Sequence, residues 1–135
     1  MPSFPKSFPV DCPVNADEID GAIYHGCDNL TPAGDDFVPF ACSDDADRQE
    51  RGKRAGCKGY GISCWKSEES AKHAQEMFEF HAKRHIFKAE VTSNCGQLKD
   101  TPSGRDSDHC TFWAYDGVSL RDSATLAWKA PGGQV

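Results

Sequence analysis

Three short segments of the chain carry side chains that can do chemistry, and each lies beside a glycine or at the end of an expected strand. Binding sites are usually built at such positions. The segments are Tyr24-His25-Gly26, Gly61-Ile62-Ser63-Cys64-Trp65 and Asp108-His109-Cys110-Thr111-Phe112-Trp113. Imidazole, hydroxyl and carboxylate groups can bind a ligand or exchange protons with it, and large aromatic rings can stack on a flat one. We therefore take the three segments as parts of one candidate site.

One helix and the strand after it have the clearest sequence pattern. Ser67 is a suitable N-cap, and Glu68 and Glu69 follow in the first turn, where the helix dipole favours negative charge. Small and apolar residues then recur at helical spacing: Ala71, Ala74, Phe78 and Ala82. The pattern predicts a helix over about residues 67–84. Apolar and polar residues alternate from 87 to 92, which predicts a strand directly after it.

The expected order of elements is strand, long loop, strand, helix, strand, loop, strand. This order predicts one compact α+β domain over residues 1–135, with a split or curved, mostly antiparallel sheet and one main helix. The strand at 109–115 is apolar on both faces and should be central. The other expected segments are an extended, proline-rich N-terminal arm (1–13), a long acidic loop (27–58), a second loop (94–108), a further strand or short helix (118–128) and a frayed tail (129–135).

The net charge of −6 disfavours a protein that coats DNA. Basic residues gather at 48–58 and 83–88, as in a local phosphate-binding patch or an ordinary solvated surface. No apolar run approaches the roughly 20 residues that cross a bilayer, so no membrane contact is expected. The start of the chain lacks the pattern of a signal peptide. We expect a cytoplasmic protein, or one delivered into another cell by a route without a classical signal peptide.

The seven cysteines cannot all pair within the chain, and we expect reduced thiols. No close C-x2-C pair is present, so no metal site is predicted. His81 and His85 have the i,i+4 spacing of some metal ligands, but no glutamate stands between them in the H-E-x-x-H manner. We expect both of these histidines, and His73, to face solvent.

The segment Ile23-Tyr24-His25-Gly26 resembles the first-strand Y-H-G signature of the diphtheria-toxin-like ADP-ribosyltransferases, in which the histidine helps to hold the ribose of NAD. The stretch from Gly59 to Ser67 is similar to that family's second strand, which is rich in glycine, serine and aromatic residues and leads into a helix. The pattern of Gly61 to Trp65, followed far downstream by His109 to Phe112, is also similar to small bacterial toxins of the ADP-ribosyltransferase-like fold.

The resemblance implies NAD as cofactor, bound between two halves of a split sheet. It implies cofactor-binding roles for Tyr24, His25, Gly26, Tyr60, Ser63 and Trp65, and catalytic roles for His25, Ser63, Asp108 and His109. Cleavage of the nicotinamide glycosidic bond builds positive charge on the ribose, so the site needs an anion nearby. The family usually places a glutamate at the start of its last catalytic strand. Here Asp106, Asp108 and His109 occupy the matching region.

The leading functional hypothesis is an NAD-dependent toxin, effector or modifying enzyme that acts on an unknown acceptor, with a protein partner or cognate inhibitor as a further possibility. A non-enzymatic alternative is an acidic immunity or phage-borne inhibitor that covers a partner's basic site. A second alternative is a metal-dependent hydrolase with cysteine and histidine ligands. Each candidate side chain also has an ordinary role: a histidine bonded to backbone, a strand serine, or an aromatic residue in the core.

Overall fold

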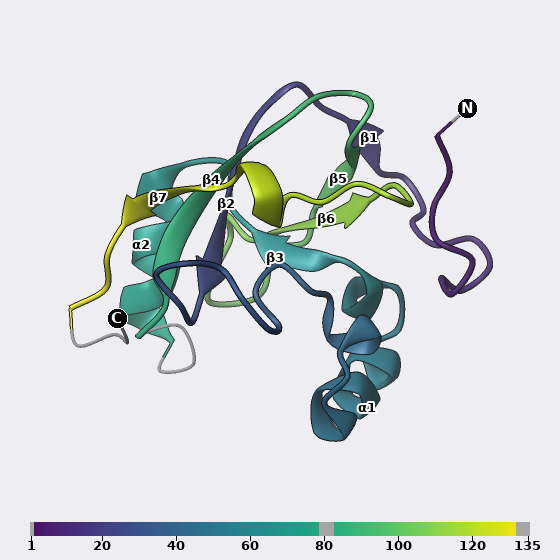
Figure 1. Cartoon of the computed structure of the whole chain (residues 1–135), viewed down its shortest axis with the longest axis horizontal. Coiled ribbons are helices and arrows are strands. Elements are labelled where there is room, and N and C mark those ends of the chain that lie inside the picture. The colour runs from purple at the N-terminus through teal and green to yellow at the C-terminus, as the bar shows by residue number, and fades with distance from the viewer. Residues whose placement is uncertain (1, 79–82, 132–135) are drawn as a thin grey trace.

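A computed structural model describes residues 2–78 and 83–131 of the chain (Figure 1). Its strands are β1 (Asp17–Glu18), β2 (Gly21–Cys27), β3 (Ile62–Cys64), β4 (His85–Val91), β5 (Gly96–Asp100), β6 (Cys110–Ala114) and β7 (Thr125–Trp128). The helices are α1 (Ala46–Arg54) and α2 (Glu68–Met77), with 3₁₀ turns η1 (Phe40–Cys42), η2 (Gly56–Tyr60) and η4 (Arg121–Ser123). The prediction of a single α+β domain is confirmed.

The strands form two antiparallel sheets, in the orders β1-β5-β6-β3 and β2-β4-β7. The predicted central strand, β6, lies between β5 and β3, with four consecutive buried residues. The sheets meet where Tyr24 and Trp65 exchange two backbone hydrogen bonds of 2.8 and 2.9 Å. β2 and β3 diverge from this bridge. The sheet is therefore split, and its two halves are joined at one end of β3.

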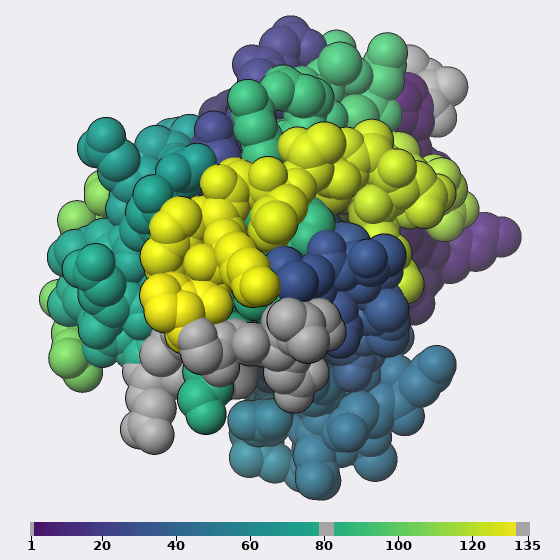
Figure 2. All heavy atoms as spheres, turned by 60° about the vertical axis from the view of Figure 1, so that its left-hand side comes forward, coloured from purple at the N-terminus to yellow at the C-terminus, as the bar shows by residue number. Residues whose placement is uncertain are grey.

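The core has two parts. One lies between the sheets and contains Ile23, Ile62, Cys64, Ala89, Val91, Leu98, Cys110, Phe112 and Leu120. The other lies under α2 and contains Trp65, Ala71, Ala74 and Ile86. The two alanines share the buried face of α2, and the Ser67 side chain accepts a hydrogen bond from the Ser70 N–H at its N-terminus, as the sequence predicted. In Figure 2 the β7 segment (yellow) lies between α2 (teal) and the loop after β2 (blue).

α2 ends earlier than predicted. Phe78 already has extended backbone angles, and residues 79–82, with His81, lie outside the described part of the chain. His85 belongs to β4 and is completely buried, and its Nδ1 accepts a hydrogen bond from the Ala130 N–H. The prediction that His85 faces solvent was wrong, whereas His73 is exposed. Ala130, in the expected frayed tail, is 1% exposed and packs against the domain, whereas Lys129 and Pro131 are exposed.

Two elements occupy segments where loops were expected. α1 lies within 27–58, and its N-terminus is capped by Asp45, whose carboxylate accepts the N–H groups of Asp47 and Arg48. β5 lies within 94–108 and pairs with β6. Gly96 is the first residue of β5, at a position where a Cβ would collide with the carbonyl oxygen of Trp113. Its role is to let β6 approach closely.

The N-terminal arm lies on the domain through the rings of Phe4 and Phe8, which pack on Tyr115 and Tyr60. A disulfide joins Cys12 of the arm to Cys57 of η2. The expectation of seven reduced thiols therefore differs from the structure, in which five cysteines are free: Cys27, Cys42, Cys64, Cys95 and Cys110. In the described ranges, no helix has the length and apolarity needed to cross a membrane.

Candidate functional site

A pocket of about 350 Å³ opens where β2 and β3 diverge. This volume is in the range of small-molecule sites, roughly 300–1,000 Å³. Its lining comes from the ends of β2, β3 and β6, from one face of α1, and from the loop that follows β2. The seam between the sheets supplies neutral polar groups, and the other walls supply charged ones.

His25 forms one side of the seam. Its Nδ1 lies 2.6 Å from the carbonyl oxygen of Ser63, across the gap between β2 and β3. Burial lowers the pKa of this imidazole to about 4, with Arg84 nearby adding to the effect and the bond to Ser63 opposing it. The ring is therefore neutral at pH 7. Because a carbonyl oxygen only accepts, Nδ1 carries the proton and Nε2 keeps a lone pair that can accept a hydrogen bond.

The other side of the seam is a chain of hydroxyls that ends in a second neutral imidazole. Thr111 pairs with Ser63 across β3 and β6, and its Oγ1 lies 2.8 Å from Oγ1 of Thr101. The Nδ1 of His109 lies 3.0 Å from the carbonyl oxygen of Thr101 and 2.9 Å from its hydroxyl. Burial lowers the pKa of His109 as well. This side of the seam is therefore uncharged and rich in groups that can form hydrogen bonds with the hydroxyls of a ligand.

α1 and its C-cap supply a wall through four residues at helical spacing: Arg48, Arg51, Gly52 and, at the C-cap, Ala55. The helix packs very closely on its neighbours. A Cβ on Gly52 would collide with the backbone of Ala41 in η1, and a Cβ on Gly59 of η2 would collide with the backbone of Gly52. The two glycines thus permit backbone contact among η1, α1 and η2. This contact holds the basic side chains of α1 beside the pocket.

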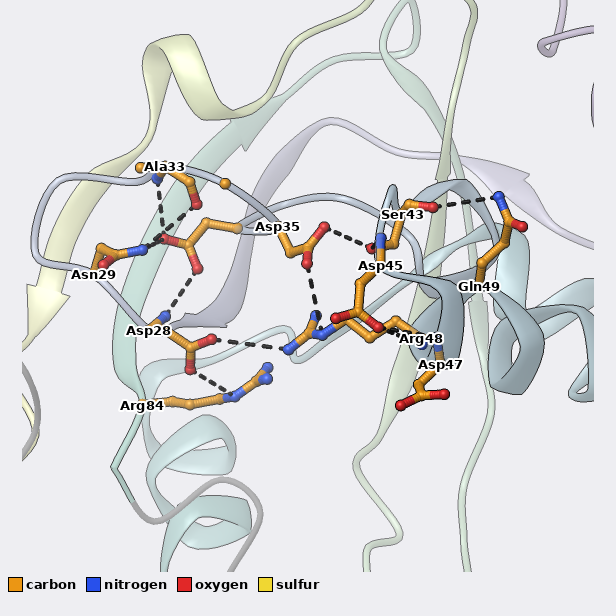
Figure 3. Close-up of polar contacts among 12 residues, drawn as sticks. Asp28, Asn29, Ala33, Asp35, Ser43, Asp45, Asp47, Arg48, Gln49 and Arg84 are labelled. Carbon is orange, nitrogen blue, oxygen red and sulfur yellow. Dashed lines mark hydrogen bonds and ion pairs between the residues drawn. The ribbon is translucent and has the colours of Figure 1, made fainter.

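Two pocket arginines are held by carboxylates (Figure 3). Arg48 lies 3.8 Å from Asp28 and 3.7 Å from Asp35, and Arg84 lies 3.4 Å from Asp28. The side chains of Arg48 and Arg84 are 19% and 13% exposed, so their pairing is only partly screened by water. Arg84 also lies against Gly26, where a Cβ would come within 3.2 Å of its Cδ.

The buried carboxylate of Asp36 organises the loop that carries Asp28 and Asp35. It accepts hydrogen bonds from the N–H groups of Asp28 and Ala33 and from the side-chain amide of Asn29. Three such bonds compensate for its burial, since it is only 4% exposed. Asp36 therefore fixes the conformation of the loop and so the positions of Asp28 and Asp35.

Arg51 and Lys58 are the exposed cations of the pocket. Within residues 2–78 and 83–131, neither has a carboxylate at ion-pair distance. The guanidinium of Arg51 lies 5.5 Å from the centre of the Phe40 ring, which also lines the pocket. These two side chains leave positive charge available at the pocket mouth.

The structure brings together His25, Gly26, Ser63 and His109 of the predicted site, all of which line the pocket. The other predicted residues lie elsewhere. Tyr60 packs on Phe8 of the arm, and Asp108 accepts a hydrogen bond from the Ser70 hydroxyl of α2. Tyr24 packs against the core part under α2.

Trp65 belongs to that same core part, and its Nε1–H donates to Asp106 at 2.9 Å. Asp106 is 3% exposed and does not line the pocket. The aromatic ring in the lining is Phe40, and the carboxylates there are Asp28, Asp35 and Asp36. Neither Asp106 nor Asp108 supplies a pocket carboxylate.

The basic stretch 48–58 is visible in the sequence, but its pattern did not place these residues in the site. The signal was the spacing of residues 48, 51, 52 and 55, one face of a helix that begins after Asp45. It was missed because this segment has almost no apolar residues to mark its buried side.

In the described part of the chain, no three His, Cys, Asp or Glu residues are grouped so as to hold a metal ion. The hypothesis of a Cys/His metal site therefore has no support in these ranges. Comparisons with protein-family models, with curated proteins and with solved structures each found no match to the chain.

Proposed function

We propose that the pocket binds NAD and that the chain is an enzyme of the ADP-ribosyltransferase type. One observation carries the proposal. Nδ1 of His25, in the Y-H-G segment, lies 2.6 Å from the carbonyl oxygen of Ser63 in β3, at a pocket between the two sheets. The resemblance noted in the sequence implied this pairing of segments around NAD. The pocket volume and its mixed lining of imidazoles, hydroxyls, cations and one aromatic ring support a nucleotide-sized, polar ligand.

The proposed reaction begins when the bond from ribose C1′ to nicotinamide breaks and nicotinamide leaves with the electron pair. The cationic ribose is then attacked by water or by an acceptor group, which donates an electron pair to C1′ and loses a proton to the solvent. The neutral Nε2 of His25 can accept a hydrogen bond from a ribose hydroxyl. The carboxylates of Asp28 and Asp35 line the pocket, and each pairs with Arg48, so a developing positive charge on the ribose would share them with that arginine.

The acidic inhibitor alternative has less support. It drew on the carboxylates of the 27–58 segment, which would have to face a basic partner. Three of them are engaged within the protein: Asp36 by its own loop, and Asp28 and Asp35 by Arg48. These three carboxylates are therefore less available to a partner than their number suggests. We propose the NAD-dependent function alone.

Calorimetry with NAD, together with chromatographic detection of free nicotinamide, tests the proposal. The variant is His25→Ala, and the matched control is His73→Ala, because His73 is an exposed histidine on α2. We expect the wild-type chain and the control to bind NAD and release nicotinamide, and His25→Ala to lose at least about tenfold in affinity, as a lost buried hydrogen bond predicts. Thermal melts show whether the variant is folded. Absence of both NAD binding and nicotinamide release in the folded wild-type protein would refute the proposal.

A further inference from the structure

The pocket lining contains two chemically different sets of side chains. The buried or half-buried set at the seam is His25, Ser63, Thr111 and His109, none of which is charged at pH 7. The exposed cations are Arg51 of α1 and Lys58 of η2. A ligand that satisfies both sets carries hydroxyl groups as well as negative charge. Ribose attached to a diphosphate carries both.

We propose that Arg51 and Lys58 bind the diphosphate of a ribose-containing nucleotide, with a ribose directed toward His25. The inference rests on the proposed function for its choice of NAD as the ligand, but the same two side chains would hold any nucleoside diphosphate. Guanidinium and ammonium groups are the side chains that usually bind phosphate, and arginine can donate two parallel hydrogen bonds to it.

The four pocket cations differ in how much charge they can offer. Arg48 and Arg84 share Asp28, and Arg48 also faces Asp35. A phosphate bound to either arginine would have to compete with these carboxylates or lie close to them. Arg51 and Lys58 carry no such penalty among the described residues. The carboxylates therefore keep Arg48 and Arg84 in place, and the outer pair provides the attraction.

Lys58 extends from a well-anchored backbone. Its neighbour Cys57 is joined to Cys12 by the disulfide, and the carbonyl oxygen of Cys57 accepts a 2.9 Å hydrogen bond from Nε1 of Trp113. Gly59, on the other side, lies against the backbone of Gly52 in α1. The same contacts fix the distance between the helix that carries Arg51 and the turn that carries Lys58. The backbones that carry the two cations are thus held in a fixed relation before a ligand binds.

The location of Arg51 near the end of α1 has a simpler explanation. Basic residues are favourable in the last turn of a helix, where the dipole is negative, and Lys53 and Arg54 share this position. Only Arg51 of these three lines the pocket. A comparison of Arg51 with Lys53 therefore separates ligand binding from the stabilisation of the helix end.

Calorimetric titration with ADP at low salt tests the inference. The proteins are the wild type, Arg51→Ala, Lys58→Ala and the control Lys53→Ala, which removes one exposed charge from the same helix. Loss of one charge-assisted hydrogen bond predicts a drop in ADP affinity of roughly tenfold to a hundredfold for each pocket variant. The control should stay within about twofold, and the affinity of the wild type should fall as salt rises. Melting curves confirm that each variant is folded.

The outcomes for ADP and NAD are separable. Binding of ADP that depends on Arg51 and Lys58, without any binding of NAD, would support the diphosphate site and contradict the proposed function. NAD binding that is equally strong in all four proteins would contradict the diphosphate site and leave the proposed function standing. Equal losses of ADP affinity in Lys53→Ala and Arg51→Ala would reduce the effect to net charge and overturn the inference.

Discussion

The disulfide between Cys12 and Cys57 should supply a large part of the stability of this domain. It connects residues 45 positions apart and ties the N-terminal arm to the turn beside the pocket. In the chain-entropy treatment, a crosslink across about 45 residues removes roughly 13 cal/mol/K from the unfolded chain, or about 4 kcal/mol at 25 °C. Domains of this kind are stable by only about 5–15 kcal/mol. We therefore expect the free energy of unfolding to fall by about 4 kcal/mol in the double variant Cys12→Ser, Cys57→Ser.

Urea unfolding, followed by tryptophan fluorescence, measures this loss. The variant in which both partners are replaced avoids a new unpaired thiol, and Cys42→Ser is the control because Cys42 is an exposed free cysteine. We expect the control to unfold within about 0.5 kcal/mol of the wild type. Wild-type protein in a reducing agent should behave like the double variant, and alkylation of the oxidised, unfolded protein should label five thiols.

Two results would refute this reasoning. Labelling of all seven cysteines in protein purified without reductant would show that the bond does not form. Equal unfolding free energies for the oxidised wild type and the double variant would show that the crosslink does not restrict the unfolded chain as calculated.

Three further predictions follow from buried contacts. Burial lowers the pKa of His25 from 6.5 to about 4. Between those pH values only the unfolded chain takes up this proton, so the free energy of unfolding should drop by up to about 3 kcal/mol as pH falls through them. Urea titrations should show a flatter pH dependence of this free energy in His25→Gln, and an unaltered dependence would contradict the lowered pKa. Gly59→Ala should lower the melting temperature and weaken ADP binding together, because its Cβ would displace Gly52, and loss of neither would contradict this packing. Trp65→Phe should cost about 1–3 kcal/mol in urea unfolding, because the buried carboxylate of Asp106 loses a hydrogen bond, and a neutral result would argue against that bond.

Local patterns were enough to predict α2 and β4 but not α1 or β5. The N-cap Ser67 and the buried alanines of α2 form a pattern that can be recognised within one short stretch of sequence. α1 is a highly charged helix whose buried contact is the backbone of Gly52, and a glycine carries no hydrophobic signal. Gly96 gives no strand signal either, because its role in β5 depends on β6, which comes from further along the chain. Glycines that serve close packing are hard to distinguish from glycines that form turns.

The candidate site was predicted in part for the same reason. The resemblance implied that His25 and Ser63 meet between two halves of a split sheet, and the two residues do meet at the seam. Adjacent residues of a strand face opposite sides, and this alternation takes the side chain of Tyr24 away from the pocket that His25 faces. Arg51 and Lys58 entered the site only through the packing of α1 on η2, which the sequence does not reveal.

The Tyr24-His25-Gly26 segment acts as one structural unit, although only part of it lines the pocket. The backbone of Tyr24 bonds with that of Trp65 and joins the two sheets. The side chain of His25 bonds with Ser63 one step beyond this bridge, where the sheets have begun to separate. Gly26 leaves room for Arg84, which pairs with Asp28 two residues further on. Tyr24 therefore determines where the pocket begins, and His25 supplies a neutral group at its seam. Gly26 leaves the space in which Arg84 lies beside the pocket.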